Sequence, residues 1–240
     1  MTATFTGCLA VVLTGLLGSV GAPCGAAGPT DASRRPWPYG GQVASRIGAA
    51  QAPAFVRERL AGLDGTRWVG IDGKGAAGKT TLAAAVAAML PGAVVVHVDD
   101  FARPRVETWE RDRFVEQVLV PLLGGRPARY ERWDWGRDAS AGWDEVAVGV
   151  PVVVEGVSST DVRLGVPWDV TLWLDLPAEV RLRRALERDG EGMRAQWVER
   201  WMPAEDAYEA TQRPQDRVDA VVDPVLDDGF LTLDGGSGPG

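Results

Sequence analysis

The feature that most constrains the fold is a glycine-rich segment, GIDGKGAAGKTT, which lies between an apolar stretch and an alanine-rich stretch. It carries the spacing G-x-x-x-x-G-K-T, with the fixed positions at Gly73, Gly78, Lys79 and Thr80. Glycines there let backbone N–H groups turn inward around phosphate oxygens, and the positive end of the following helix dipole faces the same point. In this pattern the lysine reaches the β- and γ-phosphates and the threonine hydroxyl binds Mg²⁺. The motif predicts a strand, a phosphate-binding loop and a helix in succession.

Lysine usage points to the same segment. Of the 25 Lys and Arg residues only Lys74 and Lys79 are lysines, and both lie in this loop. A compact ammonium group reaches between phosphates where a planar guanidinium group does not fit equally well. Lys74 has two open interpretations, a contact with a phosphate or a solvent-facing position. The residues expected to bind the nucleotide are Gly73, Lys74, Gly75, Ala76, Ala77, Gly78, Lys79, Thr80 and Thr81.

Apolar strand-like segments alternate with helix-like segments from residue 49 onwards. The strand-like segments are Arg67–Asp72, Ala93–Asp99, Val150–Glu155, Val170–Leu176 and Val218–Asp223. The helix-like segments are Ala54–Leu63, Lys79–Leu90, Asp112–Leu123, Ala178–Asp189 and Met193–Thr211. Nearly continuous apolar strands between helices are typical of a parallel sheet covered on both faces. We therefore predict an α/β fold whose ligand binds at the carboxyl ends of the strands.

The two ends of the chain differ from this pattern. Residues 8–20 form a short apolar run with no basic residue before it, since the first basic residues are Arg34 and Arg35. A secretory signal has positive residues ahead of its apolar run, and a membrane span is longer. We expect a poorly structured or disordered extension over 1–48, one domain over 49–228 and a flexible tail over 229–240. A signal peptide, a membrane anchor or a small structured cap are the alternatives for the first segment.

Composition excludes several classes of protein. The net charge is −8 and the isoelectric point is near 4.8, which disfavours a nucleic-acid-binding surface. The chain has no asparagine, so it cannot carry the guanine-reading N-K-x-D motif or the catalytic loop of a protein kinase. One histidine, His97, and two N-terminal cysteines cannot form a structural zinc site. We expect no nucleic-acid or membrane partner, and we expect His97 to lie in the core.

Carboxylates follow two of the predicted strands. Asp99 and Asp100 come after the second strand, where three roles are open: a general base for an acceptor hydroxyl, a partner of magnesium through water, or a structural cap. Glu155 ends a run of valines, where an unpaired acid is costly. It fits a ligand of Mg²⁺, direct or through water, and the alternative is a salt-bridged structural residue. Catalysis at Asp99 is the interpretation that the nearby phosphate loop favours.

Arginines and tryptophans supply further candidates. Four arginines lie on the predicted helix 178–189: Arg181, Arg183, Arg184 and Arg188. They fit a lid that closes over phosphates, or a solvated face that pairs with neighbouring acids. Four tryptophans fall between the Asp99 region and Glu155: Trp109, Trp133, Trp135 and Trp143. That interval is expected to form the acceptor pocket, where aromatic faces can stack flat ligands, but packing is the favoured role for most of these tryptophans.

Taken in order, IDGKGAAGKTT, VDDF, YERWDW, VVVEG and RLRRALERDG resemble the uridine kinase and phosphoribulokinase group of P-loop kinases, over about residues 66–226. The resemblance implies a three-layer fold with a five-stranded parallel sheet, a small helical lid, and ATP with Mg²⁺ as the donor. It implies an enzyme that phosphorylates a small alcohol. The catalytic residues would be Asp99, Lys79, Arg184 and Arg188, and the magnesium ligands Thr80 and Glu155.

The resemblance also implies an acceptor site. Its residues would be Asp99, Asp100, Glu110, Asp112, Trp133, Asp134, Trp135 and Arg181. The sequence departs from the family at Ala102, where a tyrosine is usual, and no histidine follows His97 to read a pyrimidine. A nucleoside such as uridine or cytidine is the leading acceptor. A sugar, a pantothenate-like compound or a natural product is the alternative, and an ATPase or regulator without an acceptor is the third. ATP as donor implies the cytoplasm; the oligomeric state is open, a homo-oligomer included.

Overall fold

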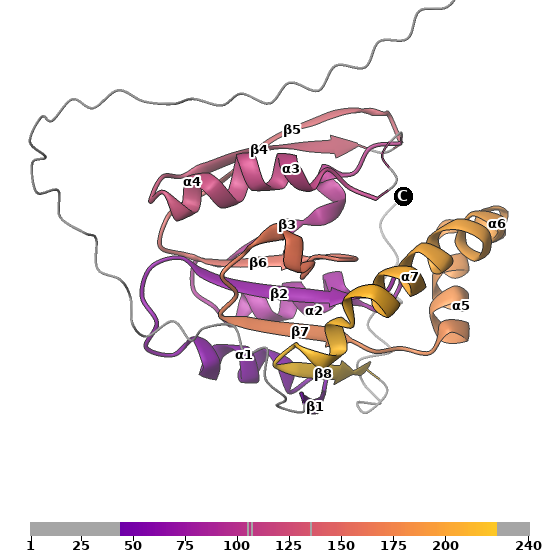
Figure 1. Ribbon diagram of the computed structural model, residues 1–240, viewed down its shortest axis with the longest axis horizontal. Helices are drawn as coiled ribbons and strands as arrows, with labels where there is room; N and C mark the ends of the chain where they lie inside the picture. Colours follow the sequence, from indigo (N-terminus) through magenta and orange to yellow (C-terminus); the bar gives the residue numbers. More distant parts are fainter. Residues whose placement is uncertain (1–43, 105, 107, 135, 225–240) are drawn as a thin grey trace, which may run out of the picture. The chain divides into compact units, whose positions relative to one another are not determined.

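Six parallel strands form the central sheet of the computed structural model, which describes residues 44–224 except 105, 107 and 135 (Figure 1). Their order is β1-β8-β7-β2-β6-β3. Their bounds are β1 Ser45–Gly48, β2 Arg67–Gly73, β3 Val94–His97, β6 Pro151–Glu155, β7 Val170–Leu174 and β8 Ala220–Asp223. The α/β fold with a parallel sheet is therefore confirmed. The predictions for residues 1–43 and 229–240 lie outside the described residues.

The sheet has one strand more than the predicted five. The additional strand is β1, which pairs in parallel with β8 so that Ser45 lies opposite Ala220. Ser45–Gly48, which precede the predicted domain start at residue 49, are part of the sheet. Only Ile47 of this strand is a large apolar residue, so the strand cannot be predicted from an apolar run. An edge strand needs little apolar sequence because it has one strand partner and stays partly exposed.

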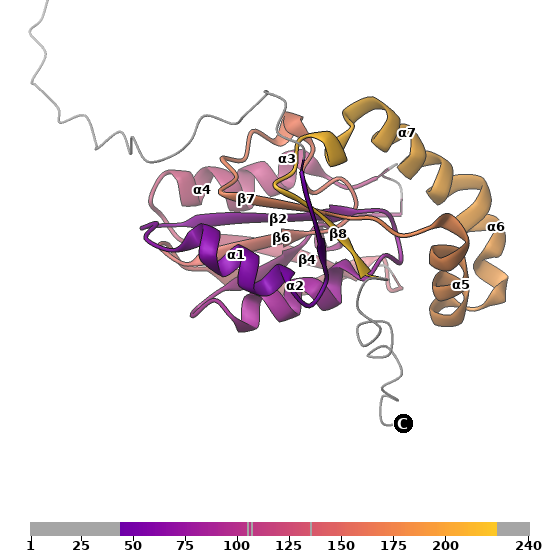
Figure 2. The ribbon, with the colours of Figure 1, turned by 90° about the horizontal axis from the view of Figure 1, so that it is seen from below.

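Two helices cover one face of the sheet (Figure 2). They are α1, Ala52–Leu60, and α2, Lys79–Ala88. Alternate residues of the strands point to this side, among them Ile71, Val153 and Leu172, and they pack against Val56 and Leu82 of the helices. Burial of these apolar side chains stabilises the layer by roughly 1.5–3 kcal/mol for each large residue. The same packing fixes α2 directly behind the phosphate loop.

The other face is covered by a helix, which the sequence predicts over Asp112–Leu123, and by a hairpin, which it does not predict. The helix runs through α3 Arg111–Phe114, a π-helical turn Val115–Leu119 and α4 Val120–Leu123. The hairpin pairs β4, Ala128–Asp134, with β5, Ala139–Val146. Phe101 joins these elements, because its ring stacks on Tyr130 at 5.3 Å and meets Phe114 edge-on at 5.6 Å. The hairpin escaped prediction because mixed polar and aromatic residues obscure its alternation.

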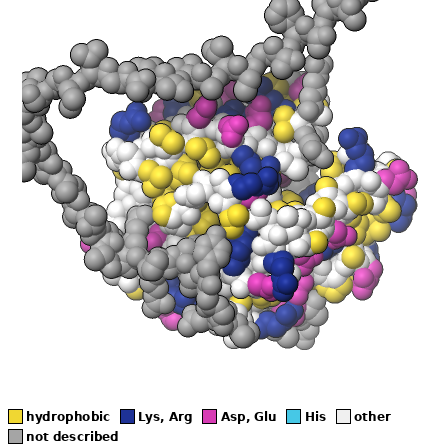
Figure 3. Space-filling model, in the orientation of Figure 1, with side chains coloured by type: hydrophobic (Ala, Val, Ile, Leu, Met, Phe, Trp, Pro, Cys, Tyr) yellow, Lys and Arg dark blue, Asp and Glu magenta, His cyan; other side chains and the backbone are white. Residues whose placement is uncertain are grey.

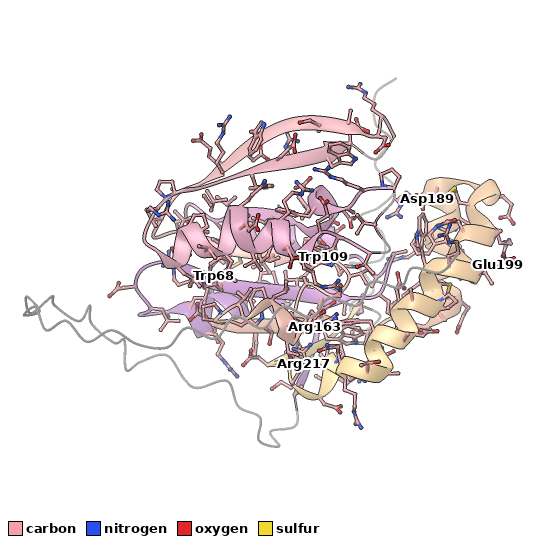
Figure 4. All side chains as sticks on the ribbon, turned by 45° about the horizontal axis from the view of Figure 1, so that its top comes forward. Trp68, Trp109, Arg163, Asp189, Glu199 and Arg217 are labelled. Carbon is pink, nitrogen blue, oxygen red and sulfur yellow. The ribbon has the colours of Figure 1, made fainter. Side chains whose placement is uncertain are left out.

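The last helices lie beyond the carboxyl ends of the strands (Figure 1). We call residues 178–201 the lid segment: it contains α5 Ala178–Asp189, a 3-10 turn Glu191–Met193, α6 Arg194–Gln196 and a π-helical turn Trp197–Trp201. It continues into α7, Met202–Gln212, which returns to β8. Figure 4 labels Asp189 at the end of α5 and Glu199 in the π-helical turn. No helix in the described part of the chain is both long and apolar enough to cross a membrane.

Candidate active site

The phosphate loop has the predicted strand–loop–helix form. β2 ends at Gly73 and α2 begins at Lys79. Gly73 has φ of 146°, and a Cβ on it would lie 2.8 Å from the backbone oxygen of Leu174, so glycine is required there. Gly78 precedes the helix with φ of 97° and offers no side chain to cap it. The first turn of α2 therefore presents its positive end to the loop without a side-chain anion, an arrangement that fits phosphate.

A buried carboxylate fixes the start of the loop. Asp72 is fully buried at the end of β2 and accepts hydrogen bonds from the backbone N–H groups of Gly73 at 2.7 Å and Ser158 at 2.9 Å. The hydroxyls of Thr160 and Tyr208 each donate to it at 2.6 Å. Charge-assisted hydrogen bonds of this kind are about twice as strong as neutral ones. Asp72 thus ties the loop to the turn after β6 and to α7.

The residues predicted to bind magnesium lie together. The hydroxyl of Thr80 donates to Glu155 Oε1 at 3.0 Å, and His97 Nδ1 lies 2.5 Å from the same oxygen. Burial opposes ionisation of Glu155, but the hydrogen bonds from His97 and Thr80 and the charge of Lys79 outweigh it, so its pKa is lowered. Lys79 Nζ donates to the carbonyl of Lys74 at 2.9 Å. An ionised carboxylate beside a threonine hydroxyl is a donor set that Mg²⁺ accepts together with phosphates.

His97 is not the core residue that its apolar neighbours suggested. Its side chain keeps 38% of its surface exposed at the end of β3, and its ring contacts Glu155. The hydrogen bond to Glu155 raises the pKa of His97, although partial burial opposes this. The apolar run Ala93–Val98 suggests a buried position for His97. A strand that is buried along its length still ends at the solvent-facing edge of the sheet, and His97 lies at that end.

The two aspartates after β3 differ in environment. Asp99 and Asp100 lie on the 3-10 turn η1, Val98–Phe101. The protein around Asp99 reduces the hydration of its carboxylate and raises its pKa, while the residue itself stays open to solvent. Lys79 opposes this shift, as do His97 and Arg188 more weakly, so these cations lie within electrostatic range of Asp99. Burial likewise raises the pKa of Asp100, whose Oδ2 is buried without a hydrogen-bond partner.

The arginines of α5 differ in burial and in their hydrogen-bond partners. Arg181 is 2% exposed, and its guanidinium donates to Glu205 Oε2 at 2.9 Å and to the carbonyl of Leu176 at 3.2 Å. The donors of Arg181 are therefore used inside the protein, and its predicted role at the acceptor stays a prediction. Arg184 has a buried Nη1 with no hydrogen-bond partner. Arg188 pairs with Asp189 at 2.7 Å.

The predicted acceptor residues are spread over α3 and the hairpin. Glu110 accepts a hydrogen bond from Arg113 at 2.7 Å and forms an ion pair with Arg103 at 3.0 Å, whereas Asp112 is exposed on α3. Arg113 also donates to the carbonyls of Asp100 and Glu131, and so links α3 to the Asp99 turn and to the hairpin.

Aromatic residues of the acceptor interval have unequal roles. The Trp133 ring is covered by the Arg103 guanidinium at 4.1 Å, and Asp134 accepts from the backbone N–H of Arg137. Trp135 lies outside the described residues. Trp109, labelled in Figure 4, is buried and donates to Ser158 at 3.0 Å, so it is a packing residue. Trp143 is 48% exposed on β5. Basic and acidic side chains are interspersed on the face shown in Figure 3.

Residues of α7 contact the loop and were not anticipated. Glu205 accepts from the backbone N–H of Gly75 at 3.0 Å, and Lys74 pairs with Asp206 at 2.6 Å and Glu209 at 2.5 Å. Lys74 is therefore paired rather than solvent-facing, and its contact with a phosphate stays a prediction. The only signal in the sequence was three acids on one helical face in a chain with two lysines.

Comparison with solved structures supports the fold assignment. A protein provisionally named a fructose transport system kinase, from Silicibacter sp. TM1040, is 24% identical with a TM-score of 0.57, and the match covers 74% of this chain and 98% of that one. A protein provisionally named a uridine kinase, from Bacillus stearothermophilus, is 20% identical with a TM-score of 0.53, and the match covers 72% and 98%. The chain shares the fold of these kinases. No family model and no curated protein matches the chain.

Proposed function

We propose that the protein is an ATP-dependent phosphotransferase that moves the γ-phosphoryl group to a hydroxyl of a small molecule. The observation that carries this proposal is the position of Asp99, a carboxylate with a raised pKa within electrostatic range of the loop residue Lys79. A phosphate loop alone is shared by many nucleotide-binding proteins. A base beside it is what transfer to an alcohol requires.

Residues at the carboxyl ends of β2 and β6 would bind ATP, the phosphoryl donor, together with Mg²⁺. The backbone of the loop from Gly73 to Thr81 and the ammonium of Lys79 would hold the phosphates of ATP. Thr80 and Glu155 would hold Mg²⁺, since their oxygens lie 3.0 Å apart and Glu155 has a lowered pKa. The metal would supply charge stabilisation on the transferred group. The fit is supported by the uncapped first turn of α2.

Asp99 would accept the proton of the acceptor hydroxyl as that oxygen bonds to phosphorus. A base works best when its pKa approaches the working pH, and the surroundings of Asp99 raise its pKa from the usual value. The released proton stays on the Asp99 carboxylate while ADP leaves with the charge that builds up on its terminal oxygen. Arg184, whose buried Nη1 has no partner, and Arg188 would neutralise that charge from the lid segment.

A nucleoside is the leading acceptor, with Asp100, Glu110, Trp133 and Asp134 in the acceptor region. The name of the Bacillus stearothermophilus protein agrees with it, and the fructose-related name of the other neighbour favours a sugar as the second candidate. ATP as donor supports a place in the cytoplasm. The proposal includes no nucleic-acid partner, because the chain carries a net charge of −8.

An ADP-release screen tests the proposal. The purified protein is incubated with Mg·ATP and single acceptors: nucleosides, sugars, pantothenate and hydroxylated natural products. We expect ADP release only with one chemical class of acceptor, and its loss in Asp99→Asn and Lys79→Ala. The matched control is Glu116→Gln, an exposed carboxylate in the π-helical turn Val115–Leu119 that is not among the predicted site residues. ADP release that is independent of every acceptor and unchanged in Asp99→Asn would refute transfer to a small alcohol.

A further inference from the structure

A buried ion pair holds the backbone of the phosphate loop at Gly75. Glu205 on α7 accepts the Gly75 N–H through Oε1 at 3.0 Å and binds Arg181 on α5 through Oε2 at 2.9 Å. Arg181 Nη1 also lies 3.5 Å from the carbonyl of Gly75. Arg181 is 2% exposed and Glu205 is 6% exposed. One pair of side chains from two different helices therefore contacts both polar groups of a single loop residue.

Packing at the same point leaves no room for a side chain on the loop. A Cβ on Gly75 would lie 2.6 Å from Glu205 Oε1 and 2.7 Å from the ring of Trp197 in the lid segment. Real Cβ atoms do not approach other atoms this closely, and Gly75 does not have the positive φ that would by itself demand glycine. The glycine at this position is thus explained by the approach of the lid segment and α7, rather than by the backbone conformation of the loop.

The contacts at Gly75 belong to a longer row along one side of α7. Lys74 pairs with Asp206 at 2.6 Å and Glu209 at 2.5 Å, and Asp72 accepts from the hydroxyl of Tyr208 at 2.6 Å. Side chains on α7 thus contact residues 74 and 75 of the phosphate loop and residue 72, which precedes the loop. The α7 residues are 205, 206, 208 and 209. Residues three and four apart lie on the same side of a helix, so a single surface of α7 makes all these contacts.

We propose that the Arg181–Glu205 pair is a positioning device through which α7 and α5 set the affinity of the loop for the phosphates of a nucleotide. The inference rests on the proposed function for the identity of the nucleotide. A buried ion pair is an expensive way to fill space, since an apolar pair of similar size is often equally stable. Its place against Gly75 gives it a use that an apolar pair lacks, because only polar groups satisfy the N–H and the carbonyl of the loop.

The consequence is coupling between the loop and the lid segment. Arg184 and Arg188 lie on α5, and after the break at Gly190 the helical segments 191–201 continue directly into α7. A nucleotide that orders the loop also orders α7 and the lid segment, and by thermodynamic reciprocity a lid that is fixed raises the affinity for the nucleotide. Arg181 and Glu205 act through the backbone of Gly75, so they are positioning residues and not catalytic ones.

The test measures binding of Mg·ATP without acceptor, by calorimetry, together with the midpoint of thermal unfolding. The first variant is the double substitution Arg181→Met/Glu205→Leu, which keeps the volume and removes both polar contacts. We expect it to unfold within a few degrees of the wild-type midpoint and to bind ATP about tenfold more weakly. The matched control is Arg129→Met/Glu145→Leu, which removes an exposed pair on the hairpin and should leave the affinity for ATP unchanged.

A second variant keeps the test decisive if the double variant does not fold. Glu205→Gln retains an oxygen for the Gly75 N–H but weakens the hold of Arg181, so we expect an affinity for ATP at least threefold weaker than in the wild type. A purely structural pair would lower the unfolding midpoint and leave the dissociation constant for ATP unchanged, and that result overturns the inference. Wild-type protein that binds no ATP at all would instead refute the proposed function.

Discussion

Replacing Asp99 by asparagine removes the proposed proton acceptor while it keeps the shape of the side chain. A general base contributes about 10²–10⁴-fold to a rate, or about 3–5 kcal/mol of transition-state stabilisation. We therefore expect the rate of phosphoryl transfer in single turnovers to fall by that factor. The affinity for Mg·ATP should stay the same or rise, because the substitution removes a negative charge within electrostatic range of Lys79, where the phosphates would lie.

The assay separates the two effects. Single-turnover transfer is measured at saturating ATP and acceptor, and the dissociation constant for Mg·ATP is measured without acceptor. A transfer rate within threefold of the wild type would refute the role of Asp99 as the base. A loss of ATP binding equal to the loss of rate would also refute it, since it would show that Asp99 serves the nucleotide site rather than the acceptor.

Further predictions follow from the same geometry. Activity should decline as the pH falls through the pKa of Asp99, and because the protein raises that pKa, the decline should begin at a higher pH than for an ordinary aspartate. A pH profile of kcat/KM for the acceptor checks this, and a profile without a decline at acidic pH would contradict it. Arg184→Met should lower kcat about 10²-fold with a smaller change in KM for ATP, whereas Arg183→Met, on the exposed side of α5, should change neither. Phe101→Ala should lower the free energy of unfolding by about 3–5 kcal/mol in urea denaturation; less than 1 kcal/mol would argue against the packing described. A chain that starts at residue 44 should keep full activity, while one that starts at residue 49 loses β1 and should unfold at a lower temperature.

The order of chemical groups along the strands could be predicted from the sequence. Each predicted strand corresponds to one strand of the sheet, and Lys79, Thr80, Glu155 and Asp99 all follow strands whose carboxyl ends meet at one edge. This succeeds because local apolar runs determine where strands lie, and because parallel topology brings the residues after them together. The helix of residues 178–189 was predicted with its observed bounds for a similar reason.

Contacts between distant elements could not be predicted in this way. Arg181 and Arg184 are three residues apart on one helix, and only the position of Glu205 decides that the first is buried and paired. His97 reads as one more residue of an apolar strand until Glu155 is placed beside it. Strand β1 depends on β8, which lies far along the chain, since Ser45 pairs with Ala220. Each of these features depends on a partner far away in sequence, so no local pattern reveals it.

The most direct test of the central claim is the fate of the γ-phosphoryl group. The protein is incubated with Mg·ATP and the acceptor that the screen identifies, and the products are separated and identified by mass spectrometry. We expect a phosphorylated acceptor formed in equal amount to ADP, with neither formed by Lys79→Ala. Free phosphate in equal amount to ADP, with the acceptor unmodified, would contradict the claim that this protein is a kinase.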